Sequence, residues 1–136
     1  MRNKLWVGLS FSLLATCAAP AFAADHIVQV GVGGGLTFTP ATVTIQAGDT
    51  VTFQGVSGFH NAVSDPGTVT AFRCGPTGCG TGPNDGQPGG GTWTNATVTF
   101  PTAGTIGYFC EVHGQAMRGT IAVNPVPVTL QQFEID

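Results

Sequence analysis

The sequence contains little charge of either sign. Lys and Arg number only four among 136 residues, Asp and Glu number seven, and charged residues make up 8% of the chain. A nucleic-acid interface or an anionic membrane surface requires clustered basic side chains, so this composition argues against both kinds of partner. Long-range electrostatic steering is equally limited, and we expect any protein partner to dock mainly through apolar contacts.

The sequence also lacks a sustained helical period and internal repeats. Its 21 Gly and 9 Pro separate short runs in which Val and Thr alternate, while 42% hydrophobic residues argue against disorder. The length suits one domain with a real core. The expected strands are residues 26–32, 38–46, 50–53, 60–63, 93–100, 105–109 and 119–123. Short strands at this spacing indicate an all-β sandwich.

Residues 1–23 are organised like a secretory signal peptide. Two basic residues, Arg2 and Lys4, precede an apolar run from Leu5 to Ala19, and Ala21-Phe22-Ala23 is a typical cleavage signal. A transmembrane anchor is the alternative, but the run is short for a bilayer. We therefore expect cleavage after Ala23 and export to the periplasm or the exterior, without a membrane span in the mature chain.

Two further points concern the exported chain. A lipid anchor on Cys17 is a weaker alternative, since Leu14-Ala15-Thr16-Cys17 only loosely resembles a lipobox. After cleavage two basic residues, Arg73 and Arg118, remain against seven acidic ones, which gives a formal net charge of −5. The mature domain is expected to span residues 24–123, and residues 124–136 form a tail to which no role is assigned.

Three cysteines remain in the mature chain, and an odd number in an exported protein requires an explanation. Cys74 and Cys79 flank Gly75-Pro76-Thr77-Gly78, a turn-forming segment that can bring them within bonding distance. An oxidising compartment then favours a local disulfide. A metal clip is the competing interpretation, but no His and no second Cys pair lies nearby. Cys110 is left without a partner.

Residues 64–91 interrupt the alternating pattern. This stretch is rich in Gly, Pro, Asp and Asn, and we interpret it as a long Gly-rich surface insertion. A short strand or turn is expected at Thr68 to Phe72. Because the insertion follows His60 closely, it is expected to cover part of the surface near that residue.

Three side chains that can bind a metal lie within eight residues: Cys110, His113 and Met117. A soft thiolate and thioether suit Cu(I), and imidazoles suit both copper oxidation states. The fourth ligand must come from elsewhere, and the mature chain offers His60 or the N-terminal His26. His60 has the better context, between a Gly-containing loop and a strand. The sequence thus predicts one copper ion that alternates between Cu(I) and Cu(II), held by these four residues.

The same residues are also compatible with other kinds of site. Cysteine, methionine and a single histidine all occur as ordinary core residues. Zinc is the best competing metal, although methionine is a poor zinc ligand and structural zinc sites prefer several thiolates. A Cys–His hydrolase would need an orienting third residue and an oxyanion site, and neither is visible. With no open metal position and no second metal cluster in the sequence, we do not expect an enzyme.

The sequence resembles the cupredoxins of the plastocyanin/azurin family, in particular plastocyanins and pseudoazurins. Three segments carry the resemblance, residues 38–53, 59–63 and 100–119, and together with flanking strands it covers residues 26–123. It implies a Greek-key sandwich of about eight strands with copper near one end. It also implies Cys110 as the thiolate ligand, His60 and His113 as equatorial imidazoles and Met117 as the axial ligand.

The resemblance implies a blue (type 1) copper protein that carries single electrons between redox partner proteins as a monomer. Partners would dock near His113, the ligand expected nearest to solvent. Asn61 would brace the loop of Cys110, and Phe59 and Glu111 would flank the ligands. The charge of Glu111 would favour oxidised copper. Two departures stand out: the spacing from His113 to Met117 lies between those of plastocyanins and amicyanins, and the 64–91 insertion has no counterpart.

Two other functions are compatible with the sequence. Cleavage after Ala23 would leave Ala24-Asp25-His26 at the N-terminus, where an amine, two backbone nitrogens and an imidazole can bind Cu(II). This motif would suit a copper-binding or delivery protein, although His26 more simply begins the first strand. A metal-free binding module on the same scaffold is the second alternative, and the complete ligand set argues against it.

Overall fold

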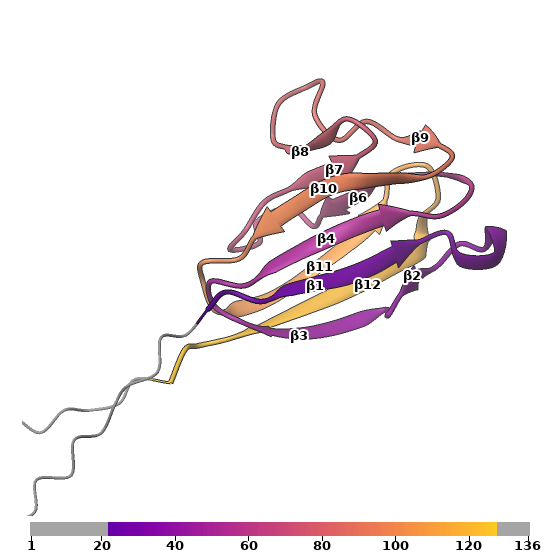
Figure 1. The fold of residues 1–136 in the computed structure, drawn as a ribbon. Coiled ribbons are helices and arrows are strands. Elements are labelled where there is room, and N and C mark those ends of the chain that lie inside the picture. Colours follow the sequence, from indigo (N-terminus) through magenta and orange to yellow (C-terminus); the bar gives the residue numbers. More distant parts are fainter. Residues whose placement is uncertain (1–21, 128–136) are drawn as a thin grey trace, which may run out of the picture.

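The computed structural model describes residues 22–127, which form a β-sandwich (Figure 1). The element bounds are β1 (Asp25–Val30), η1 (Val32–Gly34), β2 (Phe38–Thr39), β3 (Thr42–Gln46), β4 (Thr50–Gly55), β5 (Phe59–His60), β6 (Ala62–Ser64), β7 (Arg73–Gly75), β8 (Gly78–Gly80), β9 (Gly89–Gly90), β10 (Trp93–Thr99), β11 (Gly104–Cys110) and β12 (Gly114–Asn124). Among these residues no helix is long and apolar enough to cross a bilayer.

Two sheets form the layers of the sandwich. One has the strand order β10-β4-β1-β2 and the other the order β3-β12-β11-β6-β7-β8, while β5 and β9 form a small ribbon. The pairs β1–β4 and β3–β12 are parallel, and the remaining pairs are antiparallel. The prediction of an all-β sandwich is confirmed, with twelve short strands in the described residues in place of about eight.

Two predicted strands are divided in the structure. The segment 38–46 is split into β2 and β3, which belong to different sheets, at the cis peptide bond between Thr39 and Pro40. Proline has no amide hydrogen to donate, so it marks the point where the chain leaves one sheet for the other. The segment 60–63 is likewise divided, because β5 pairs with β9 whereas β6 pairs with β11.

An aromatic cluster fills the space between the sheets. The ring centroid of Tyr108 lies 4.7 Å from that of Phe38 and 5.4 Å from that of Phe53. Phe72 stacks 5.4 Å from Phe53 and 5.9 Å from Phe100. All five side chains are buried, and such edge-on aromatic packing adds to the stabilisation from buried apolar area.

The insertion is more ordered than its composition indicates. Of the short strand or turn expected at residues 68–72, the structure has a bend at residues 69 and 70, and the next strand, β7, begins only at Arg73 and pairs with β8. The predicted disulfide between Cys74 and Cys79 is present and joins these two strands. Phe72 and Cys74 both point into the core, so the insertion extends one sheet and contributes to the interior.

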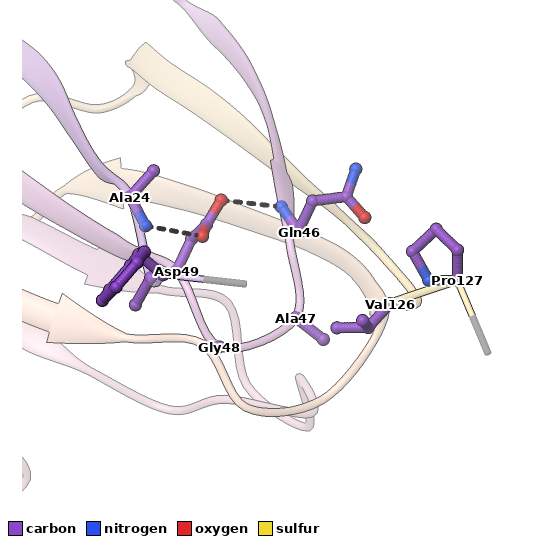
Figure 2. A pocket seen from close by; sticks show the side chains of 9 residues that line it. Ala24, Gln46, Ala47, Gly48, Asp49, Val126 and Pro127 are labelled. Carbon is purple, nitrogen blue, oxygen red and sulfur yellow. Dashed lines mark hydrogen bonds between the residues drawn. The ribbon is translucent and has the colours of Figure 1, made fainter. Parts of the chain in front are cut away.

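The end of the sandwich near residues 24 and 127 is held by Asp49. Its carboxylate accepts hydrogen bonds from the amide of Ala24 at 2.9 Å and from the amide of Gln46 at 3.0 Å, as Figure 2 shows. Its other contact is with Nε2 of His26, at 2.9 Å. These contacts, led by the two backbone amides, lower the pKa of Asp49 to about 2. The start of β1 is thus attached to the turn before β4.

This carboxylate predicts a specific loss of stability in acid. Because the pKa of Asp49 is lower in the folded chain than in the unfolded chain, its contribution is complete above about pH 4 and is lost as the pH falls toward 2. We expect Asp49→Asn to unfold at a lower temperature than the parent protein at pH 6, and the difference to shrink at pH 2. Thermal unfolding followed by circular dichroism measures both, and a difference that is constant with pH would contradict the assignment.

Candidate metal centre

Three predicted ligands converge at the end of the sandwich away from Asp49. His60 lies at the end of β5, Cys110 ends β11, and His113 lies in the turn that leads into β12. The two Nδ1 atoms of His60 and His113 are 3.2 Å apart. The Sγ atom of Cys110 lies 3.8 Å from Nδ1 of His60 and 3.5 Å from Nδ1 of His113. One sulfur and two imidazole nitrogens therefore face a common point.

The fourth predicted ligand, Met117, lies in the strand that leaves this point. The pairing of β11 with β12 changes register between Phe109 and Cys110, so that Phe109 pairs with Arg118 and Cys110 pairs with Gly114. This irregularity releases residues 115–117 from regular pairing beside the end of β11. Met117 is completely buried, as is Cys110. The thioether is thus kept away from water within the same short hairpin as the thiol.

The two histidines differ in exposure. His60 is 3% exposed, whereas His113 is only partly buried and is the least buried of the four residues. Burial and the neighbouring His113 lower the pKa of His60, which keeps its imidazole neutral and its lone pair available. The arrangement therefore combines a protected interior with one imidazole that reaches toward solvent.

Two glycines provide the space in which His60 lies. Gly31 and Gly58 both have a left-handed backbone, with φ of 78° and 80°. A Cβ atom on Gly58 would overlap Nε2 of His60, and one on Gly31 would lie 2.8 Å from its Cδ2. Glycine is required here both for backbone conformation and for space. The sequence analysis noted a Gly-containing loop before His60 but missed this role.

The donor atoms fit a copper ion. Each neutral imidazole can donate only one hydrogen, yet Nε2 of His60 is buried without a hydrogen-bond partner in the described chain and both Nδ1 atoms point at each other and at sulfur. With the hydrogen of each ring on Nε2, two Nδ1 lone pairs and the sulfur face one point, and this arrangement is costly unless a cation lies between them. Among the described residues the cluster contains no carboxylate, and one thiolate with two imidazoles matches copper better than structural zinc.

A hydrogen-bond network holds the residue after Cys110. The buried side chain of Asn61 accepts from the amide of Glu111 at 3.0 Å and donates to its carboxylate at 2.7 Å. The carboxylate also forms a salt bridge with Arg73, with a nitrogen–oxygen distance of 2.7 Å. This guanidinium, assisted by Asn61 and opposed by partial burial, holds the pKa of Glu111 below its ordinary value. Asn61 thus holds both the backbone and the side chain of the residue that follows Cys110.

Two other observations complete the site. Phe59, predicted to flank the ligands, is 55% exposed on β5 beside His60 and lies on the outer surface. Arg73 was missed by the sequence analysis. Its signal was available, because it is one of only two basic residues after residue 23 and Glu111 is an acidic residue beside a candidate ligand.

Comparison with known proteins agrees with this geometry. The family model for copper binding proteins of the plastocyanin/azurin family matches residues 25–124. The plastocyanin of Scenedesmus fuscus is 42% identical over 107 residues, which cover 73% of this chain and 99% of that protein. The chloroplastic plastocyanin of Tetradesmus obliquus is 39% identical over 123 residues, covering 85% of this chain and 73% of that protein.

A solved structure gives the same result. Oxidised plastocyanin from Dryopteris crassirhizoma superposes with a TM-score of 0.52 and 28% identity, covering 72% of this chain and 99% of that chain. The match of the family model extends from the start of β1 to the end of β12 and so includes all four predicted ligands. The chain therefore belongs to the plastocyanin/azurin family of copper-binding proteins.

Proposed function

We propose that this chain is an exported one-electron carrier in which His60, Cys110, His113 and Met117 hold a single copper ion. The observation that carries the proposal is the convergence of the Cys110 thiol and two imidazole Nδ1 atoms at a buried point, with Met117 buried in the same hairpin. Bound copper supplies one-electron chemistry by alternating between Cu(I) and Cu(II). The protein side chains hold one ligand geometry for both states and exclude water.

His113 is the proposed route for electrons between the site and a partner. It is the most exposed of the four residues, and Gly114 and Ala116, which follow it in β12, are small enough to allow close approach. A single imidazole edge at the surface gives a short path to a docked partner. The buried thiol and thioether stay protected from oxidants in solvent.

The surface around His113 is apolar. Four hydrophobic side chains at this end of the sandwich are exposed: Val32, Leu36, Phe59 and Val112. They come from the segment after β1, from β5 and from the turn after β11, and the first of these lies at the tip occupied by η1 in Figure 1. An exposed apolar group of this kind indicates a transient docking surface, and the low charge of the chain agrees with it.

Electron exchange between two copies of the protein tests this surface. We expect Leu36→Asp to slow exchange between the reduced and oxidised forms roughly tenfold, because a charge within the docking surface must be desolvated. Val69→Asp is the matched control, since Val69 is also exposed, 55% against 44% for Leu36, but lies against Gly104, at the opposite end of β11. Nuclear magnetic resonance line broadening in mixed samples measures the rate. Equal slowing in both variants would show that only net charge matters.

The carrier function is tested by reductive titration. The copper-loaded protein is expected to accept one electron per chain, with full loss and full recovery of its visible band over repeated cycles. A protein that releases its copper on reduction would instead act in copper delivery. Copper content measured before and after each cycle separates the two functions.

Export rests on the predicted signal peptide, most of which lies outside residues 22–127, as does Cys17. The contact of Ala24 supports cleavage after Ala23, because the new α-ammonium group would form at the position where the Ala24 nitrogen already lies 2.9 Å from the Asp49 carboxylate. Phe22, which cleavage would remove, is 87% exposed. Mass spectrometry of the secreted protein tests the cleavage site, and a mass that includes Phe22 would contradict it.

The same contacts argue against an N-terminal copper site in Ala24-Asp25-His26. The nitrogen of Ala24 and Nε2 of His26 both contact Asp49, and Asp25 and His26 pair with Thr50 and Val51 of β4. A square-planar chelate would have to break these interactions. The mature protein is therefore expected to bind one copper ion, and a second equivalent in the metal analysis that disappears on removal of residues 24–26 would revive the delivery function.

A further inference from the structure

The insertion reaches the metal end of the sandwich through one side chain. Arg73, the first residue of β7, donates to the Glu111 carboxylate from Nε at 3.0 Å and from a terminal nitrogen at 2.7 Å. Its other contacts are within the insertion: the carbonyl oxygen of Asp85 at 2.8 Å and the side-chain oxygen of Gln87 at 3.2 Å. One guanidinium thus joins the 83–87 loop to the residue that follows Cys110.

From Glu111 the connection continues to the metal site. Glu111 is covalently next to Cys110, and its amide and carboxylate are both bonded to Asn61, which in turn follows His60. Asn61 also donates to the carbonyl oxygen of Gly86 in the insertion, at 3.0 Å. The insertion therefore contacts the neighbours of two candidate ligands by two separate routes.

We propose that the 64–91 insertion braces the metal site, with Arg73 as the positioning residue that fixes Glu111 and the backbone at Cys110. The proposal rests on the proposed copper function for its consequences, but the brace itself is a property of the protein chain. The insertion would hold the Cys110 thiol in place before and after the metal binds. Such supporting contacts ordinarily control metal affinity and ligand geometry.

An ordinary surface ion pair would be a weaker explanation. Exposed pairs contribute little, because both side chains are mobile and solvated. The side chain of Arg73 is only 20% exposed, however, and its planar fork is shared among a carboxylate, a carbonyl and an amide oxygen. A group with this many fixed partners has one geometry, which is what positioning requires.

The insertion is also packed tightly enough to act as a support. The disulfide between Cys74 and Cys79 closes the hairpin directly after Arg73, and the side chain of Cys74 is completely buried. Gly86 has a φ of 55°, and a Cβ atom there would overlap the carbonyl of Arg73, so the 83–87 loop lies directly on β7. Backbone contact at this distance transmits the position of the hairpin to the loop and to Glu111.

Three variants test the brace: Arg73→Lys, Arg73→Gln and, as a control, Asp85→Asn. The control changes a charge in the same loop, but the contact of Asp85 with Arg73 is through its backbone carbonyl, which the variant keeps. The first measurement is amide hydrogen exchange at Glu111 in the metal-free protein. The second is the rate at which the copper-loaded protein loses metal to a chelator, with the visible spectrum recorded alongside.

In both Arg73 variants we expect the Glu111 amide hydrogen to exchange, and copper to be released, about tenfold faster than in the parent. Their visible spectra should also change, whereas Asp85→Asn should behave like the parent. Lysine keeps the charge but cannot span all the oxygen atoms at once. If Arg73→Lys matches the parent, charge and not position is what matters, and the brace is overturned. An unchanged rate of Glu111 amide exchange in both Arg73 variants also overturns the brace. A parent protein without a visible copper band would overturn the copper function, and the amide exchange rates would then still decide the brace.

Discussion

Replacing Cys110 by serine is expected to abolish the intense visible band that the protein acquires with Cu(II). The band requires a thiolate bound to copper, and Cys110 is the one free cysteine among residues 22–127, with its Sγ atom 3.5 Å from Nδ1 of His113. A serine hydroxyl at neutral pH is a far weaker ligand for either oxidation state. We expect the absorbance to fall by about tenfold or more, the largest effect of any single substitution in this chain.

The absorption spectra of the two proteins, titrated with Cu(II) at neutral pH, measure this effect. Cys110 is completely buried and serine is close to it in size, so circular dichroism should show the same fold in both. Zn(II) is the control metal, since it can occupy the site without producing colour. A band of undiminished intensity in the serine variant would remove Cys110 from the site, and a colourless parent protein would favour copper delivery or a metal-free module.

The second large effect is expected at Gly58. Gly58→Ala must tolerate a φ of 80° and place a methyl group against Nε2 of His60, a residue that is only 3% exposed. The left-handed backbone alone costs about 1–2 kcal/mol for a residue other than glycine. Displacement of the imidazole is expected to weaken copper binding in addition, by about tenfold to a hundredfold.

Gly91→Ala separates these two contributions. Gly91 has a φ of 79°, almost the same as Gly58, but nothing lies within 4 Å of the position its Cβ would occupy. Both variants should therefore lose similar thermal stability from backbone strain, whereas only Gly58→Ala should lose copper affinity, measured by competition with a chelator. Equal copper affinities in the two variants would contradict the inference that Gly58 provides the space for the His60 ring.

The sandwich and the ligand set could be predicted from the sequence because their signals are local. Apolar and polar side chains alternate from Ala96 to Thr99 and predict a strand, and the spacing of Cys110, His113 and Met117 predicts a shared site. Pro40 was a visible signal of an edge or a bend within residues 38–46, since proline has no amide hydrogen to donate within a sheet. What could not be predicted was that β2 and β3 belong to different layers, because this depends on pairing with β1 and β12.

The contacts that support the site were harder to predict for the same reason. Arg73 and Glu111 are distant in sequence, and only the pairing of β6 with both β7 and β11 brings their backbones to one region. The space that Gly31 provides for His60 depends equally on a contact between separate loops. Composition indicated an irregular insertion, but it could not show that β7 and β8 pair within it or that Phe72 and Cys74 enter the core.

The pairing of β3 determines how late the second sheet can form while the chain is being synthesised or exported. Within residues 22–127 its one partner is β12, so the second sheet is incomplete until residues 114–124 are available. A chain that emerges N-terminus first from a ribosome or a translocation channel must therefore keep Thr42–Gln46 unpaired until almost all of it has emerged. Cys110, His113 and Met117 arrive in the same final stretch, so the metal can be captured only by a chain that is nearly complete.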